Sequence, residues 1–205
     1  MDIPGKTAQP NKTIKSQQPS PTPTNRLNRI IVVGDSGAGK TILAQQLAQR
    51  LRLSHIELDA LFWEPNWTKA TPEVFRQRLM QALSAERWVV DGNYSSVSDL
   101  TWAQADTIVW LDYGLATILM RLLRRTFRRI FTREELWNGN RESFVKGLFT
   151  RDSIILWAIT TYSEKRKRYL ATQADPAYAY LSIIRLRTPR ETQAWLAHLP
   201  VPTPT

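Results

Sequence analysis

Residues 34–41, Gly-Asp-Ser-Gly-Ala-Gly-Lys-Thr, constrain the fold of this chain more than any other feature. They fit the pattern G-x-x-x-x-G-K-[ST] at every fixed position. A β-branched run at 29–33 precedes them, and leucines recur at four-residue spacing within 40–52, as on one face of a helix. A strand, a glycine-rich turn and a helix in this order predict a phosphate-binding loop at the edge of a sheet.

The residue types in this segment suit the chemistry of a bound nucleotide. Glycines let backbone N–H groups approach a phosphate closely, and the helix N-terminus adds favourable partial charge. Lys40 is placed to reach the β- and γ-phosphates of ATP, and the Thr41 hydroxyl to ligate Mg²⁺. We predict that ATP binds through Gly34, Asp35, Ser36, Gly37, Ala38, Gly39, Lys40 and Thr41. The alternative is a chance glycine-rich turn, which the flanking strand and helix patterns disfavour.

Further apolar runs predict the rest of a sheet. They occupy 55–58, 88–90, 107–111 and 181–184, and helix-like segments separate them. Thr71 and Pro72 are typical of a helix start, and we expect this helix to continue to Glu86. Strands that are apolar throughout and alternate with helices predict a parallel sheet covered on both faces, a three-layer α/β domain.

Composition and the chain ends limit the remaining possibilities. Residues 1–25 and 200–205 are poor in large apolar side chains, so we expect disordered tails around one domain at 26–199. The 205 residues include no cysteine and only two histidines, which excludes disulfide scaffolds and thiolate sites and disfavours a multi-histidine metal centre. No apolar stretch approaches the ~20 residues of a membrane span, and we expect a soluble, cytoplasmic protein.

Acidic residues follow two of the other predicted strands. In a parallel sheet the carboxyl ends of the strands lie at one edge, where ligands bind. We expect Asp91 to hold Mg²⁺ or act in the site, and Asp59 to face the second substrate, although a turn or a solvated loop would explain either residue. Glu57 is a weaker candidate, and Asp112 suits a turn.

Two tryptophans follow Asp59 within eight residues. Trp63 and Trp67 could wall off an acceptor pocket or stack on a base, and packing in the core is an equal alternative for Trp63.

Basic residues gather in the second half of the chain. The net charge is +10, and residues 121–168 hold 13 Lys/Arg against 5 Asp/Glu. Arg121 and Arg125 share a predicted helix face, and with Arg151 they predict a basic lid over about 121–152 that stabilises a transferring phosphoryl group. A solvated basic face or a nucleic-acid patch is the alternative. We expect 165–168 to be a solvated helix face, and Arg187 to contact the nucleotide base.

Several segments resemble the adenylate-kinase-like branch of P-loop kinases, and within it the proteins known as DNA topology modulation proteins or putative adenylate kinases. The similarity lies in residues 55–63, 88–94, 136–142 and 151–157 and extends over about 29–197. It implies a five-stranded parallel sheet ordered 2-3-1-4-5 with inserted acceptor-binding and lid segments. It also implies that Asp91-Gly92 matches an Asp-Gly of nucleoside monophosphate kinases, Arg121 and Arg125 the paired lid arginines, and Arg151 the arginine that closes the lid.

The chain departs from adenylate kinases after Gly92. Asn93-Tyr94-Ser95 stands where those enzymes have Phe-Pro-Arg, and the Glu57/Asp59 pair resembles kinases of small hydroxyl compounds such as shikimate. We therefore expect a monomeric or homodimeric kinase that transfers the γ-phosphate of Mg·ATP to a small molecule or nucleotide. A nucleotide-dependent DNA- or RNA-binding regulator is the second hypothesis, and membrane partners are not expected.

Overall fold

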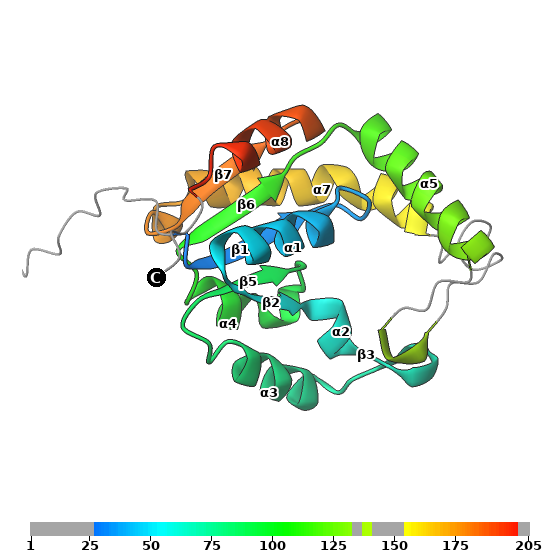
Figure 1. The fold of residues 1–205 in the computed structure, drawn as a ribbon, viewed down its shortest axis with the longest axis horizontal. Coiled ribbons are helices and arrows are strands. Elements are labelled where there is room, and N and C mark those ends of the chain that lie inside the picture. The colour runs from blue at the N-terminus through cyan, green and yellow to red at the C-terminus, as the bar shows by residue number, and fades with distance from the viewer. Residues whose placement is uncertain (1–26, 133–136, 141–153, 201–205) are drawn as a thin grey trace, which may run out of the picture.

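A parallel five-stranded sheet forms the centre of the protein (Figure 1). The computed structural model describes residues 27–132, 137–140 and 154–200. The sheet order is β2-β5-β1-β6-β7. Its strands are β1 (Arg29–Gly34), β2 (Ser54–Glu57), β5 (Trp88–Asp91), β6 (Thr107–Leu111) and β7 (Ser182–Leu186).

Helices connect these strands. The described helices are α1 (Lys40–Leu51), α2 (Leu58–Phe62), α3 (Pro72–Ala82), α4 (Ser98–Trp102), α5 (Leu115–Thr132), α7 (Ile154–Ala174) and α8 (Pro189–Ala197). Four 3₁₀ turns are η1 (Pro65–Trp67), η2 (Ser95–Val97), η3 (Trp137–Gly139) and η4 (Pro176–Tyr178). An antiparallel pair, β3 (Trp63–Glu64) and β4 (Thr68–Lys69), forms a small separate sheet.

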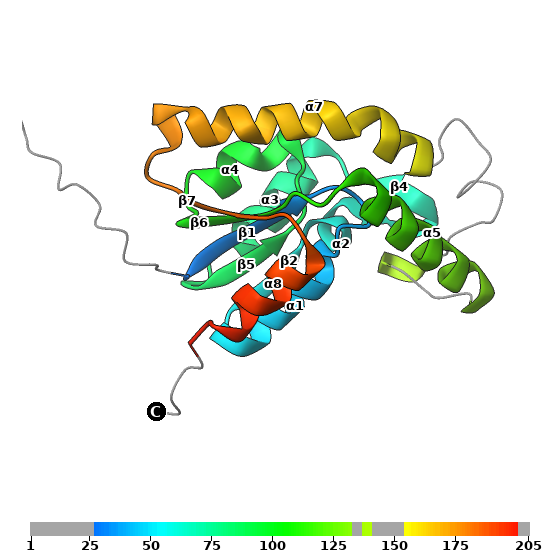
Figure 2. The ribbon, with the colours of Figure 1, turned by 90° about the horizontal axis from the view of Figure 1, so that it is seen from above.

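The alternation of side chains along each strand produces two cores. Ile30 and Val32 of β1 pack toward α1 and α8, whereas Ile31 and Val33 pack toward α3 and α7. All four are at most 1% exposed. Figure 2 shows α1 and α8 on one side of the sheet and α4 and α7 on the other. Because both faces are covered, the central strands are apolar throughout, as parallel sheets require.

Strand register brings the functional loops to one edge of the sheet. Val32 pairs with Asp91, and Asp91 pairs in turn with Glu57. On the other side of β1, Gly34 pairs with Leu111, and Leu111 with Leu186. The carboxyl ends of all five strands are thus level, so the loops that follow them meet at this edge.

The predicted fold class is confirmed. Counted along the chain, the strands of the main sheet lie in the order 2-3-1-4-5, and the β3–β4 pair is an addition that the sequence did not indicate. The helix expected to reach Glu86 ends at Ala82, because the chain turns at Leu83 to enter β5. Among the described residues, no helix combines the length and apolar character needed to cross a bilayer.

Candidate active site

The phosphate loop lies between the end of β1 and the start of α1, as predicted. Gly37 and Gly39 have φ values of 87° and 95°, a left-handed region that side chains disfavour. The carbonyl oxygen of Asp35 accepts hydrogen bonds from the backbone N–H of Ala38 and from Lys40 Nζ, both at 3.1 Å. The loop is therefore held as a compact turn with the lysine folded over it.

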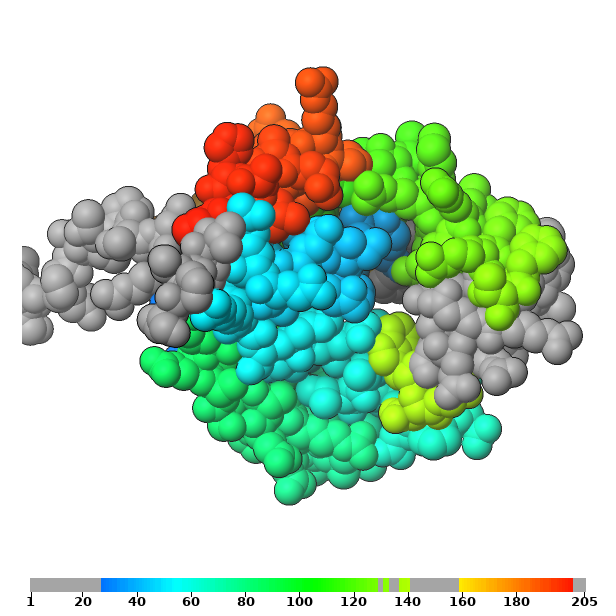
Figure 3. All heavy atoms as spheres, in the orientation of Figure 1, coloured from blue at the N-terminus to red at the C-terminus, as the bar shows by residue number. Residues whose placement is uncertain are grey.

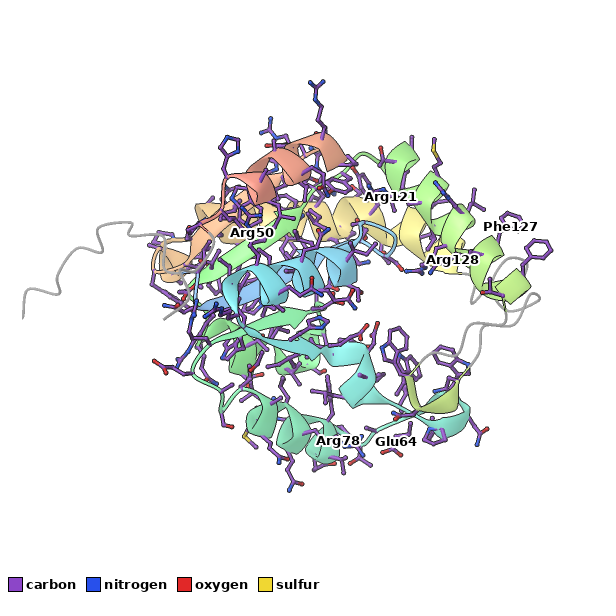
Figure 4. The ribbon with its side chains drawn as sticks, viewed as in Figure 1. Arg50, Glu64, Arg78, Arg121, Phe127 and Arg128 are labelled. Atoms are coloured by element: carbon purple, nitrogen blue, oxygen red, sulfur yellow. The ribbon has the colours of Figure 1, made fainter. Side chains whose placement is uncertain are left out.

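Two arginines of α5 contact this loop directly. Arg121 Nη1 donates to the Ala38 carbonyl at 3.0 Å, and Arg125 Nη2 donates to Ser36 Oγ at 3.3 Å. Arg124 and Arg128 join them around a cavity of about 630 Å³ whose floor is the phosphate loop. Figure 3 shows the surface hollowed between α1 and α5, and Figure 4 shows Arg128 on the inner side of α5 and Phe127 pointing away.

Asp91 lies beside Lys40 and Thr41, and the residue is 4% exposed. Burial raises the pKa of its carboxyl group, an effect that the Lys40 ammonium and the Thr41 hydroxyl oppose. Asp91 Oδ1 has no hydrogen-bond partner among the described residues. Glu57 faces it from the neighbouring strand and also lines the cavity.

These groups suit Mg²⁺. Within the described part of the chain, no group of three or more His, Asp or Glu side chains could form a complete metal site. Mg²⁺, however, is commonly held by one or two carboxylates together with substrate phosphates. A buried carboxylate oxygen without a partner, next to a threonine hydroxyl and a phosphate loop, fits that arrangement.

Asp59 lies on α2, close enough to Asp91 for the two carboxylates to interact. It accepts a hydrogen bond from the Tyr94 hydroxyl, which comes from the loop after β5. Burial and the nearby carboxylate both raise the pKa of Tyr94, so the hydroxyl keeps its proton. One hydrogen bond thus joins α2, which carries the predicted acceptor-side residue Asp59, to the loop after β5.

Aromatic rings form a cluster next to Asp59. Trp63 packs edge-on against Phe62 and Trp67, with ring centroids 5.0 and 5.4 Å apart. Trp67 is 37% exposed and approaches Trp137 of η3. Asn140 fixes this contact, since its side chain accepts from Trp67 N and donates to the Glu64 carbonyl. The core alternative for Trp63 is not supported, because its ring is only partly buried.

In the segment 165–168, Arg166, Lys167 and Arg168 are exposed, as predicted, but Lys165 is not. Lys165 Nζ lies 2.9 Å from Asp35 Oδ1, with the two side chains 14% and 9% exposed. Burial lowers the pKa of the Lys165 ammonium, which the Asp35 carboxylate opposes. Lys167, by contrast, is 70% exposed. The sequence does not predict this difference in exposure between Lys165 and Lys167, because it depends on which side of α7 packs against the phosphate loop.

Asp112 is also more than a turn residue. Its carboxylate pairs with Arg185 of β7 and Arg166 of α7, and its side chain is 3% exposed. The turn prediction considered only the local Asp-Tyr-Gly sequence. Both partners lie more than 50 residues away in the chain, which local reasoning could not detect.

The other two arginines predicted for the site are Arg151 and Arg187. Arg151 lies outside the described residues, as do 133–136 and the rest of 141–152 in the expected lid. Arg187 is exposed, and its backbone N–H donates to Glu191. Arg187 follows β7, which borders β6 rather than β1. The order of the strands therefore does not place Arg187 next to the phosphate loop, as the expected base contact required. The start of α8 lines the cavity instead, through Pro189, Thr192 and Gln193.

Comparison with known proteins shows the family of the chain. Residues 36–198 match the model of a family described as shikimate kinase, which is most of the chain. The chain belongs to the shikimate kinase family. The match supports a phosphotransferase with a nucleotide-binding P-loop kinase fold.

Individual relatives are distant. The crystal structure of shikimate kinase from Bacteroides thetaiotaomicron is 18% identical in sequence to this chain, with a TM-score of 0.50. The match covers 83% of this chain and 94% of that protein. A gluconokinase from Sinorhizobium meliloti 1021 is 19% identical, with a TM-score of 0.46, and the match covers 83% of this chain and 92% of the gluconokinase. The uncharacterized protein YqaC of Bacillus subtilis is 28% identical over 114 residues, which are 55% of this chain and 64% of YqaC. The match thus spans less than two thirds of that relative's length.

Proposed function

We propose that the protein transfers the γ-phosphate of ATP to a hydroxyl group of a small molecule or nucleotide. The observation that carries the proposal is the convergence of Lys40, Arg121 and Arg125 on one phosphate loop. Phosphoryl transfer needs positioning and positive charge around the moving group, and no covalent enzyme intermediate.

Each residue near the loop has a role in this proposal. Backbone N–H groups of 34–41 and Lys40 bind the phosphates, and Arg121 and Arg125 stabilise negative charge that develops during transfer. Thr41 and Asp91, with Glu57 beside them, would hold Mg²⁺, which neutralises phosphate charge when bound. Arg151 remains the proposed lid residue, whereas Arg187 is assigned no contact, because β7 borders β6 rather than β1.

Asp59 is the proposed partner of the acceptor hydroxyl. Its carboxylate accepts a hydrogen bond from Tyr94, and in this proposal it orients the acceptor hydroxyl and accepts its proton. A compound with a neutral hydroxyl-bearing group fits this carboxylate and the neighbouring tryptophans better than a second phosphate group would.

We also propose a place for the chain within the wider fold group. The segments 55–63 and 88–94 resemble DNA topology modulation proteins and adenylate-kinase-like proteins. In this proposal those segments form the acceptor side, next to Asn93-Tyr94-Ser95, where Ser95 stands in place of a phosphate-binding arginine. The resemblance therefore supports kinase chemistry with an acceptor other than AMP.

A phosphotransfer screen tests the function. The purified protein with Mg·ATP would meet a panel of nucleoside monophosphates, nucleosides, sugars and hydroxy acids, with ADP release measured for each. Lys40→Ala should lower kcat/KM by roughly 100- to 1000-fold, as the loss of one transition-state donor does elsewhere. Lys167→Ala, which removes an exposed lysine, is the matched control and should keep full activity.

Two results of the screen would contradict the proposed function. Full acceptor-dependent turnover by Lys40→Ala would contradict the proposed role of the phosphate loop. Tight Mg·ATP binding without turnover on any acceptor would instead favour the nucleotide-dependent regulator.

A further inference from the structure

Helix α7 contacts three functional loops with one of its faces. Tyr162, Lys165 and Tyr169 are spaced at i, i+3 and i+7, which places them on one side of a helix. Tyr162 donates its hydroxyl to the Tyr113 carbonyl after β6 at 3.1 Å. Tyr169 accepts at 3.0 Å from the Asn93 side chain, after β5. Between them, Lys165 reaches the loop after β1.

The Lys165 contact lies at a sensitive point of that loop. Its partner Asp35 is the second residue of the phosphate loop, and its carbonyl accepts from both Ala38 N and Lys40 Nζ. The orientation of the Asp35 peptide therefore sets where the Lys40 ammonium lies. The Asp35 carboxylate, in turn, is oriented by Lys165, and the pair is largely buried.

We propose that Lys165 is a positioning residue that fixes the phosphate loop for nucleotide binding through Asp35. The inference rests on the proposed function only in taking this loop as the site of the triphosphate. Lys165 acts in two ways. It holds the Asp35 peptide in the orientation that supports Lys40, and it neutralises a carboxylate that would otherwise repel the phosphates of the nucleotide.

Removal of the ammonium should therefore weaken nucleotide binding, because the negative charge of Asp35 is no longer neutralised. A buried charge left without its partner is costly, and the loop is expected to rearrange to hydrate it. Removal of the Asp35 charge as well should relieve most of this effect. A lysine that simply bound phosphate on its own would lose affinity whatever residue stood at position 35.

A double-mutant cycle separates these two possibilities. Mg·ATP binding would be measured by calorimetry for the full-length chain and for Lys165→Met, Asp35→Asn and the double variant. Lys165→Met should raise the Kd about tenfold, within the range for residues of one ion-pair network. The double variant should bind at least as tightly as Lys165→Met. Independent effects that multiply in the double variant would overturn the proposal, as would a Kd for Lys165→Met within about twofold of the original protein.

Two controls accompany the cycle. Lys167→Met removes a lysine of the same helix that is exposed, and should leave the Kd unchanged. Lys165→Arg keeps the charge and should restore most of the affinity. If Lys165→Met fails to fold, Asp35→Asn and Lys165→Arg still give the comparison, because Asp35→Asn removes the charge from the other side of the pair.

A kinetic readout distinguishes this inference from the proposed function. In an active enzyme, Lys165→Met should raise KM for ATP and leave KM for the acceptor unchanged. Should no acceptor be phosphorylated by the original protein, the proposed function fails while the binding cycle still decides the role of Lys165. Equal changes in both KM values would indicate a general structural role and contradict the inference.

Discussion

Gly37 is required by two separate features of the phosphate loop. Its φ of 87° is in the left-handed region, and a Cβ built at this position would lie 2.9 Å from the Ile118 carbonyl oxygen. That oxygen belongs to the backbone of α5 and cannot turn aside as a flexible side chain could. The close packing of α5 on the loop, which brings Arg121 and Arg125 to their positions, therefore depends on glycine here.

Gly37→Ala should consequently destabilise the protein and disturb the site together. We expect a loss of about 2–3 kcal/mol in the free energy of unfolding from backbone strain and overpacking. Urea unfolding and Mg·ATP calorimetry measure the two effects. Gly114→Ala is the control, because no atom lies within 4 Å of the added Cβ. A Gly37→Ala protein that retained its stability would show that α5 can move away from the loop.

Asp112 links three elements at the same edge of the sheet. It follows β6 and pairs with Arg185 of β7 and Arg166 of α7. The Arg185 guanidinium also lies over the Trp110 ring, 4.7 Å from its centroid. One buried carboxylate thus joins two adjacent strands to the helix that carries Lys165.

Asp112→Asn should lower the free energy of unfolding by about 3 kcal/mol, since it leaves a largely buried arginine without its charge partner. Thermal or urea unfolding would measure the loss. Asp99→Asn is the matched control: it breaks the Asp99–Arg76 pair, whose side chains are 60% and 38% exposed, and should change stability little. A similar, small effect of both substitutions would mean that the Asp112 pair is screened by solvent in solution.

Helix α5 shows how one element can serve two environments. Arg121 and Arg125 both line the cavity, as their predicted shared face implies, and Arg124 and Arg128 line it as well. Leu122, in contrast, is fully buried beside Gly37 of the phosphate loop, whereas Phe127 and Phe131 are 43% and 82% exposed. The helical period predicts which side chains of α5 lie on the same face. It does not predict which of the apolar side chains are buried by neighbouring elements.

The distribution of charge over the whole molecule bears on the nucleic-acid hypothesis. The excess of positive charge in 121–168 suggested an exposed basic patch. Four arginines of α5 instead line the cavity at the phosphate loop, and Lys165 and Arg166 form ion pairs with Asp35 and Asp112. Much of the described charge in this segment is therefore directed at a small anion site rather than along an extended surface.

We accordingly expect no retardation of duplex DNA or RNA in a gel-shift titration at about 0.15 M salt. Binding at low salt should fall steeply as salt is added, because it would rest on phosphate contacts alone. A titration with and without Mg·ATP serves as the internal control. Retardation that persisted at physiological salt and depended on the nucleotide would favour the regulator over the kinase.

Local sequence was sufficient for the fold and for the donor side of the site. The glycine pattern at 34–41, its flanking strand and helix, and the apolar runs predicted the sheet, because each depends on residues close together in the chain. The same holds for the shared face of Arg121 and Arg125 and for the acids at the strand ends. The resemblance to kinases supplied the strand order, which the structure confirms.

Contacts between distant segments were decided only by the tertiary structure. Lys165 and Asp35 are 130 residues apart, and Arg185 and Asp112 are 73 apart. Nothing in their local sequence distinguishes them from solvated charges. Burial, which makes an ion pair costly to break, arises only when the loops at one edge of the sheet meet α7. The sequence by itself determined that a phosphate loop would form, and the packing of α5 and α7 around it decided which charges face it.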